Sequence, residues 1–181
     1  GAAGGLGVAM VQVARGLGAT VVAVVSSDEK ESVARSAGAE EVVRSDGTWQ
    51  DSLRELNAGR GADVIVDPVG GDRFDDSVRC LAPEGRLVVV GFTEGRIPQV
   101  QVNRLLLRNI SVVGAAWGAF LGVEPALFSE TQAALQRMLD AGDVAPVVGA
   151  TFAFDDAAQA LRLLEERRAT GKVVLSAWHR S

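Results

Sequence analysis

The sequence is poor in the residues on which several kinds of site depend. It contains one cysteine, one histidine and no tyrosine among 181 residues. A single cysteine, Cys80, cannot form an internal disulfide, and this usage is typical of a reducing compartment such as the cytoplasm. Because His179 is the only histidine, a zinc site of cysteine and histidine ligands is excluded. We therefore predict no metal site and a cytoplasmic location.

Long apolar runs and concentrated positive charge are also missing. The longest apolar runs, such as 20–25 and 87–90, are far shorter than the ~18 residues of a membrane span. No basic-then-apolar leader opens the sequence. The formal net charge is −5 and the 18 lysines and arginines are scattered, whereas nucleic-acid binding needs a basic patch. We predict a soluble protein with no membrane or nucleic-acid partner.

Glycine and apolar residues, by contrast, are abundant. There are 21 glycines, well above the usual share of ~7%, and 48% of residues are hydrophobic. Apolar runs of strand length alternate with helical patterns, which predicts an α/β fold with a doubly wound parallel sheet, the Rossmann fold. The predicted strands are 20–25, 41–43, 63–67, 87–91, 110–114 and 172–175. The predicted helices are 6–17, 29–37, 50–57, 72–81, 125–141 and 155–167, and residues 144–154 are expected to be irregular.

Two predicted helices carry further signals. Asp28 and Glu31 form a predicted N-terminal capping pair for the second helix. The helix at 125–141 has an apolar stripe, which predicts packing against a sheet. The stripe consists of Leu127, Phe128, Thr131, Leu135, Met138 and Leu139.

A glycine-rich loop, Gly-Ala-Ala-Gly-Gly-Leu-Gly, occupies residues 1–7 and runs directly into an apolar helix. Glycines at such a place let backbone N–H groups approach a pyrophosphate at the positive end of the helix. The alternative is that the loop is a tight turn that binds no ligand. The strand after this helix ends at Ser26, 19 positions beyond Gly7, where a dinucleotide-binding unit places its ribose-reading residue. This spacing favours a dinucleotide site.

The residues at the end of that strand indicate the type of cofactor. A site for NAD has an acidic residue there, whereas this chain has Ser26 and Ser27, with Lys30 one helical turn later. Two hydroxyls and an ammonium suit a 2′-phosphate, so we predict NADPH rather than NADH. The alternative for Lys30 is an ordinary solvated lysine. Asp28 and Glu29 are explained by helix capping and by the helix dipole.

Other strand ends and polar clusters are less specific. Three predicted strands end in turns, at residues 67–71, 91–92 and 114–117, and ligands of doubly wound sheets bind at such ends. Each could also be a strand followed by a turn. Capping explains the carboxylate pairs at 75–76 and 155–156. No histidine is available as a base for a serine hydrolase.

Several of these motifs together resemble the cofactor-binding half of the zinc-free quinone oxidoreductases, which belong to the medium-chain dehydrogenase/reductase superfamily. The motifs are residues 1–14, 26–30, 38–43, 67–71, 81–88 and 171–175. The resemblance covers essentially the whole chain. It implies NADPH as the cofactor and hydride transfer to a quinone or an activated alkene, without a metal.

The resemblance also implies which residues bind the cofactor and leaves the catalytic residues unassigned. It places Gly4, Gly5, Leu6 and Gly7 at the pyrophosphate, Ser26, Ser27 and Lys30 at the 2′-phosphate, and Asp67, Val69, Gly91 and Phe92 in the cleft towards the nicotinamide. Family members often carry a tyrosine shortly after the third strand, where this chain has Arg44 followed by serine. Arg44 could meet the 2′-phosphate or be solvated.

The family pattern extends beyond this sequence. Its members have an N-terminal substrate domain and a central strand before the glycine loop, so we expect an N-terminally truncated chain with a gap in the sheet and no activity of its own. We expect a Rossmann domain at 1–143, a segment 144–181 that packs on the substrate domain, and a homodimer paired through strand 110–114. The alternatives are an enoyl reductase domain of a fatty-acid or polyketide synthase and a non-catalytic nucleotide-sensing module. Ser26 argues against a methyltransferase, which generally has an acidic residue there.

Overall fold

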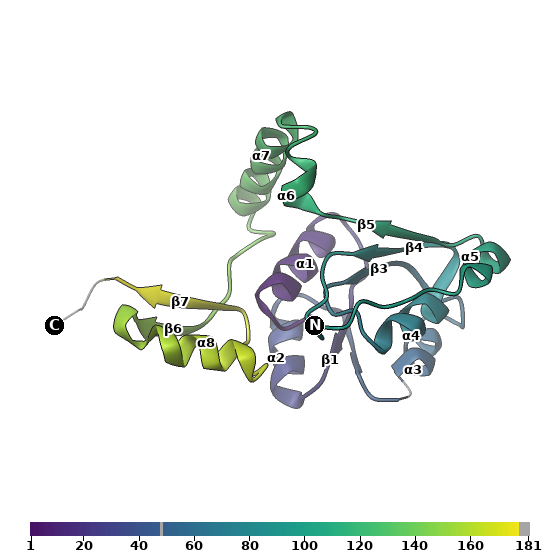
Figure 1. Cartoon of the computed structure of the whole chain (residues 1–181), viewed down its shortest axis with the longest axis horizontal. Coiled ribbons are helices and arrows are strands. Elements are labelled where there is room, and N and C mark those ends of the chain that lie inside the picture. Colours follow the sequence, from purple (N-terminus) through teal and green to yellow (C-terminus); the bar gives the residue numbers. More distant parts are fainter. Residues whose placement is uncertain (48, 178–181) are drawn as a thin grey trace. The chain divides into compact units, whose positions relative to one another are not determined.

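The chain alternates helices with parallel strands (Figure 1). The computed structural model describes residues 1–47 and 49–177, so His179 lies outside the described residues. The strands are β1 (Val22–Val25), β2 (Glu41–Arg44), β3 (Ala62–Asp67), β4 (Leu81–Val89), β5 (Ser111–Gly114), β6 (Val148–Ala153) and β7 (Lys172–Ser176). The helices are α1 (Gly5–Gly16), α2 (Asp28–Ser36), α3 (Trp49–Glu55), α4 (Arg73–Cys80), α5 (Val102–Arg108), α6 (Trp117–Phe120), α7 (Ala126–Ala141) and α8 (Ala157–Glu165), with a short 3-10 helix at Phe154–Asp156.

The described strands form three parallel sheets. β1 pairs with β2, β3 with β4 and β4 with β5, and β6 pairs with β7. Each parallel pair is joined through a helix or a long connection, as such pairs require. The predicted α/β class with parallel strands is thus confirmed. β1 and β3 lie in different sheets, and the expected gap in the sheet stays a prediction.

The chain divides into two compact units, and each is described by itself. The loop unit, which holds the glycine-rich loop, comprises Ala2–Arg44 and Ala133–Ser181. The second unit, named here the sheet unit because it holds the three-stranded sheet, comprises Gly1 and Ser45–Gln132. These units cut across the predicted division into 1–143 and 144–181, which stays a prediction.

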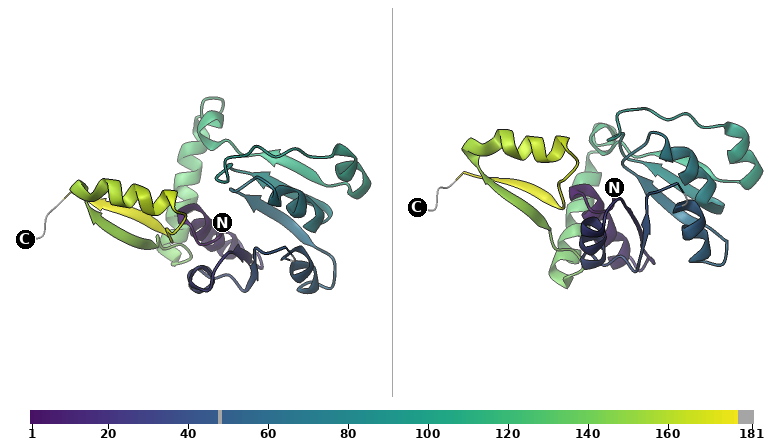
Figure 2. Two further views of the ribbon diagram at one scale, coloured as in Figure 1. Left: turned by 60° about the horizontal axis from the view of Figure 1, so that its bottom comes forward. Right: turned by 90° about the horizontal axis from the view of Figure 1, so that it is seen from below.

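The loop unit is built on small side chains. Its core consists of Ala3, Val8, Val11, Ala23, Val25, Ala34, Ala37 and Ala39. α2 packs on β1 and β2, and α8 packs along β6 and β7, as the views in Figures 1 and 2 agree. The Gln12 side chain ties α1 to the later segment, because its amide exchanges two hydrogen bonds with the backbone of Ala145, at 2.9 and 3.2 Å.

The sheet unit has larger side chains in its core, which consists of Phe74, Val78, Leu81, Leu87 and Ile110. α4 packs on β3 and β4, and α3 packs on α4. β4 begins at Leu81, earlier than predicted, because its first residues include Pro83 and Gly85, which indicate a turn from sequence. The pairing of β3 with β4 is irregular there, between Ala62 and Val64.

Two helix predictions need correction. The N-cap of α2 is Ser27, whose hydroxyl accepts a hydrogen bond from the Lys30 backbone N–H at 3.3 Å, so Asp28 is already inside the helix. The apolar stripe of α7 is not packed into a core, because no residue of α7 is buried and Phe128 is 52% exposed. Met138 instead lies against Gly16 of α1, which makes this a helix contact.

Candidate functional site

The glycine-rich loop leads into α1, and the first N–H groups of this helix make no hydrogen bond within the helix. Gly4 is the N-cap, with extended backbone and no side-chain cap, and the first intrahelical bond runs from Val8 N–H to the Gly4 carbonyl at 2.9 Å. The N–H groups of Gly5, Leu6 and Gly7 therefore precede that bond and form the positive end of the helix. This is the arrangement that holds a phosphate.

The loop lies directly against β7. Gly4 forms a parallel bridge with Gly171, and the Gly171 N–H donates to the Ala3 carbonyl at 2.9 Å. A Cβ at Gly5 would lie 3.0 Å from the Gly171 carbonyl oxygen and 3.4 Å from the Lys172 Nζ. A side chain at position 5 would therefore crowd the backbone of β7, and the ammonium of Lys172 lies beside the loop.

The predicted 2′-phosphate residues come together at the end of β1. The Lys30 Nζ donates to the Ser26 Oγ at 3.2 Å and to the Arg167 carbonyl at 3.0 Å. Ser27 caps the helix that carries Lys30. The ammonium is therefore held in place by two oxygens, and it is not a freely solvated side chain.

A pocket of about 310 Å³ opens beside this lysine within the loop unit. Its lining includes three cations, Lys30, Arg167 and Arg168, and one carboxylate, Glu29. The remaining lining residues are Ser27, Gly149, Ala150, Leu163 and Thr170. Sequence reasoning missed Arg167, Arg168 and Lys172 as site residues, although Lys172 lies in one of the motifs that carry the resemblance.

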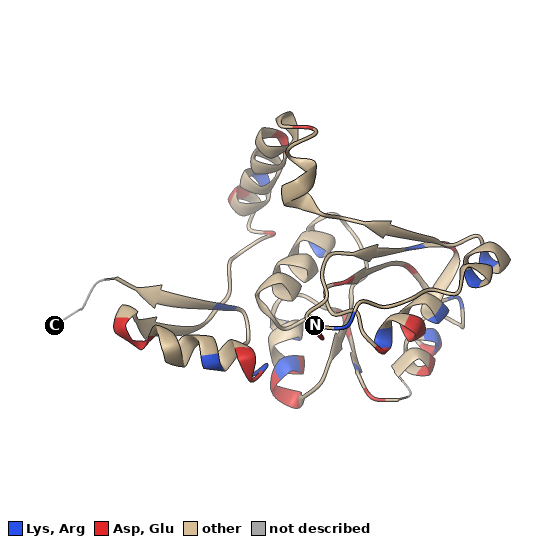
Figure 3. Ribbon diagram, in the orientation of Figure 1, with Lys and Arg blue, Asp and Glu red and all other residues tan. Residues whose placement is uncertain are grey.

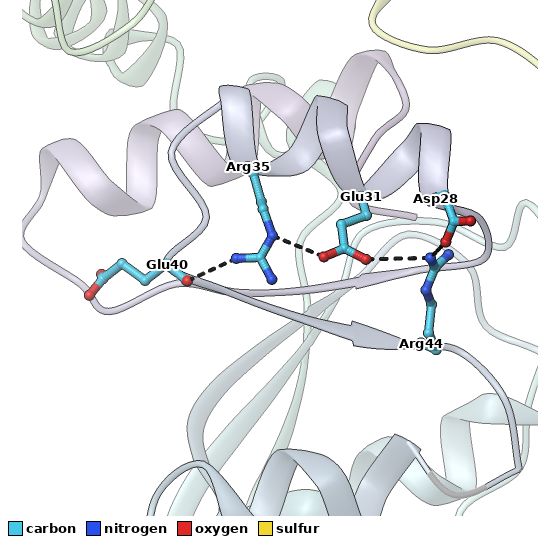
Figure 4. A network of polar contacts seen from close by, with 5 residues as sticks. All are labelled: Asp28, Glu31, Arg35, Glu40 and Arg44. Carbon is cyan, nitrogen blue, oxygen red and sulfur yellow. Dashed lines mark hydrogen bonds and ion pairs between the residues drawn. The ribbon is translucent and has the colours of Figure 1, made fainter.

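Arg44, by contrast, is engaged by carboxylates. Its guanidinium pairs with Asp28 and lies 3.4 Å from Glu31 (Figure 4). The same Glu31 pairs with Arg35 at 2.9 Å, and Arg35 donates to the Glu40 carbonyl at 3.3 Å. Arg44 thus belongs to an ion-pair network, and its role as a phosphate ligand stays a prediction.

The four predicted residues at the ends of β3 and β4 gather in the sheet unit. Asp67 is 7% exposed, and its Oδ1 accepts from the N–H groups of Val69 at 2.8 Å and Gly70 at 3.0 Å. A Cβ on Gly91 would approach the Pro68 carbonyl at 3.3 Å, and Phe92 lies against Gly70. The Asp67 carboxylate therefore orders the turn after β3, a role that follows from its hydrogen bonds.

Other candidate chemistry is limited in the described residues. Across 1–47 and 49–177, no group of three or more His, Cys, Asp or Glu side chains could hold a metal ion. None of the helices described is long and apolar enough to cross a membrane. Cys80 is buried, and burial raises the pKa of its thiol to about 11. A thiol that stays protonated is a poor nucleophile.

Comparison with known proteins decides the family. The family model of the zinc-binding dehydrogenases matches residues 5–140. Rat quinone oxidoreductase-like protein 2 is 40% identical over 177 residues, covering 97% of this chain and 51% of the relative. The chain belongs to the zinc-free quinone oxidoreductase family of the medium-chain dehydrogenase/reductase superfamily.

Two further proteins are similar to this chain, one compared in sequence and one in both sequence and fold. The 2-haloacrylate reductase of a Burkholderia species is 32% identical, over 96% of this chain and 53% of its own length. A crystal structure of the quinone oxidoreductase from Thermus thermophilus, also solved with NADPH, has a TM-score of 0.83 and 37% identity, over 96% of this chain and 55% of that one. The chain spans about half the length of these relatives.

Proposed function

We propose that this chain forms the cofactor-binding part of an oxidoreductase that uses NADPH to reduce a quinone or an activated alkene. The observation that carries the proposal is the Lys30 ammonium, held between the Ser26 hydroxyl and the Arg167 carbonyl at the end of β1. A 2′-phosphate finds cations and hydroxyls at that place, where three cations outnumber the one carboxylate, Glu29, of the pocket.

The residues at the glycine loop fit the rest of the cofactor. The N–H groups of Gly5, Leu6 and Gly7 would bind the pyrophosphate, and Lys172 would add a cation beside Gly5. Arg168 would add a second cation near the 2′-phosphate, because it lines the pocket of Lys30.

In the sheet unit, Asp67 would orient the turn that carries Val69, with Gly91 and Phe92 beside it, at the nicotinamide end of the cofactor. When bound, NADPH supplies the hydride. Residues of this chain would bind and orient it, and the acceptor would be a small molecule with an electron-poor double bond.

Two groups of relatives support the choice of acceptor. Among similar proteins some are called quinone oxidoreductases, and one is called a 2-haloacrylate reductase. Quinones and acrylates both have a carbon–carbon double bond conjugated to a carbonyl group, so both accept hydride in the same way. An enoyl reductase domain of a larger synthase would use the same chemistry.

The arrangement of the whole protein is part of this proposal. The segment 144–181 would pack on a substrate domain, and the end of the family match at residue 140 supports this division. β5 pairs on one side with β4, and pairing of two β5 strands on the other side would give a homodimer. A monomeric mass of the full-length protein in solution would contradict the dimer. The cytoplasm is the proposed compartment.

The cofactor proposal is tested by exchanging the charge of Lys30. In fluorescence titrations we expect the protein to bind NADPH more tightly than NADH. Lys30→Glu should weaken NADPH binding by about tenfold or more, because charge-assisted hydrogen bonds are lost, and should change NADH binding little.

Arg60→Glu is the matched control, since Arg60 is an exposed residue of the sheet unit paired with Asp63. Its affinity for NADPH should equal that of the unaltered protein. Equal affinities for the two cofactors in the unaltered protein would overturn the assignment of NADPH.

A further inference from the structure

A second cavity, in the sheet unit, has four arginines among its nine lining residues. It measures about 390 Å³ and lies between α3, α4 and α5. Its charged lining residues are Arg54, Arg79, Arg104, Arg108 and Asp51. Figure 3 shows basic residues on these helices. Four arginines against one aspartate give the lining an excess of positive charge in a protein whose net charge is −5.

Two of these arginines are only partly satisfied by the protein. The guanidiniums of Arg54 and Arg108 donate to the same carbonyl oxygen, that of Arg79, at 2.7 and 2.9 Å. Arg54 has in addition Asp51 at 3.8 Å. Since a guanidinium has five N–H donors, both side chains keep donors for a further acceptor.

The other two arginines share one carboxylate. Arg79 pairs with Asp75 at 3.0 Å, and Arg104 pairs with the same carboxylate. Asp75 does not line the cavity. The ion pairs of these four arginines involve two carboxylates, Asp51 and Asp75, so two positive charges remain at the cavity. Arg54 and Arg108 come from different helices and meet at one atom.

Capping of α4 explains part of this arrangement. Arg79 is in the last turn of α4, where carbonyl groups lack helical partners and cations are favourable. One guanidinium would suffice for that carbonyl, and two like charges at one neutral oxygen repel each other. An anion between them would remove the repulsion.

We propose that this cavity binds a phosphoryl group, as free phosphate or as a small phosphate ester. A dianion matches two guanidiniums, whose forked donors suit phosphate oxygens. The cavity is larger than one phosphate needs, and Leu107, 78% exposed at its edge, offers an apolar contact for an organic group. None of its lining residues belongs to the Lys30 pocket, so the proposal is independent of the cofactor.

The test is calorimetric titration of inorganic phosphate into the full chain carrying Lys30→Gln, with chloride used to keep the ionic strength constant. This background removes the cation proposed for the cofactor. A saturable site whose affinity depends on the cavity arginines is expected, besides any phosphate bound by the N–H groups of the glycine loop. Arg54→Gln and Arg108→Gln should each weaken it by about tenfold or more, and Arg60→Gln, at an exposed site outside the cavity, should leave it unchanged.

A third variant avoids any loss of the helix cap. Leu107→Glu adds a negative charge at an exposed position of the cavity edge and should weaken phosphate binding while the fold is kept. Absence of a saturable site, or unchanged affinity in the Arg54, Arg108 and Leu107 variants, would overturn the proposal and leave the arginines as caps of α4. Phenyl phosphate separates the sources, because tighter binding than phosphate supports an ester and equal binding supports the free ion.

Discussion

The cores of the two units are built from side chains of different size. In the loop unit every core residue is alanine or valine, whereas the sheet unit has phenylalanine, leucine and isoleucine in its core. Small side chains let helix backbones come close to strands, and the loop unit is where backbone N–H groups form the candidate phosphate site. Close approach of backbone segments is thus found in the loop unit, and burial of large apolar side chains is found in the sheet unit.

The stability of the two units should therefore respond in opposite ways to a change in the size of a core side chain. A core of large side chains loses most when a side chain is cut back, because a cavity remains. A core of small side chains loses most when a side chain is enlarged, because nothing can move aside in a close-packed interior.

The largest expected effect is in the sheet unit. Leu87 is fully buried in β4, and Leu87→Ala should lower the free energy of unfolding by about 2–5 kcal/mol. Urea denaturation measures this loss. Val113→Ala, at a position of β5 that is 40% exposed, is the control and should cost much less; equal costs would contradict the role given to the large core.

Enlargement is the corresponding test in the loop unit. Ala34 in α2 is fully buried, and Ala34→Leu should destabilise by about 1–3 kcal/mol through overpacking. Ala133→Leu on the exposed side of α7 is the control. A stabilising effect of Ala34→Leu would show that this core has unfilled space.

The buried thiol makes the stability of the sheet unit depend on pH. Burial raises the pKa of Cys80 from 9.0 to about 11 in the folded protein, so below pH 9 the thiol is neutral in both states. Between pH 9 and 11 only the unfolded state ionises, and the free energy of unfolding should fall by about 2 kcal/mol. Urea denaturation at several pH values measures the slope, and in Cys80→Ala this contribution should disappear.

The smallest effect is expected at the Arg44 network. Asp28 is fully exposed and Arg44 about one-third exposed, and surface ion pairs contribute about 0–1 kcal/mol. Arg44→Ala should change the free energy of unfolding by less than about 1 kcal/mol, measured by the same denaturation. A larger loss would mean that the network holds α2 onto β2.

The features predicted well from sequence are those set by neighbours along the chain. The glycine loop, α1 and the cluster of Ser26, Ser27 and Lys30 depend on spacing within some thirty residues, and the structure brings that cluster together. Strand positions followed from valine-rich runs. Burial on both faces, which such runs indicate, is not found in β3, β5 and β7, where for example Val64 is 57% exposed.

The features that were missed depend on distant segments. Arg167 meets Lys30 across 137 positions, and Lys172 reaches Gly5 only because β7 lies beside the loop. The segment 144–154, which holds β6, was expected to be irregular because Pro146 lies in it, yet residues of β6 pair with β7. Gly149 fits this pairing, since a Cβ there would lie 1.7 Å from the Thr170 carbonyl oxygen. α5 was missed because it has only seven residues, Val102–Arg108, which is shorter than the window over which helical periodicity is recognised.

The bond between Lys30 and Arg167 has a consequence for how the protein is made. The sheet unit is nearly continuous in sequence, so it can fold while the rest of the chain is still being synthesised. The loop unit joins two segments separated by 88 residues, from Ser45 to Gln132, and its second segment is synthesised after the sheet unit. Until β7 has been synthesised, the glycine loop of the nascent chain has no β7 to pair with and stays exposed. We therefore expect chaperones to bind the loop unit.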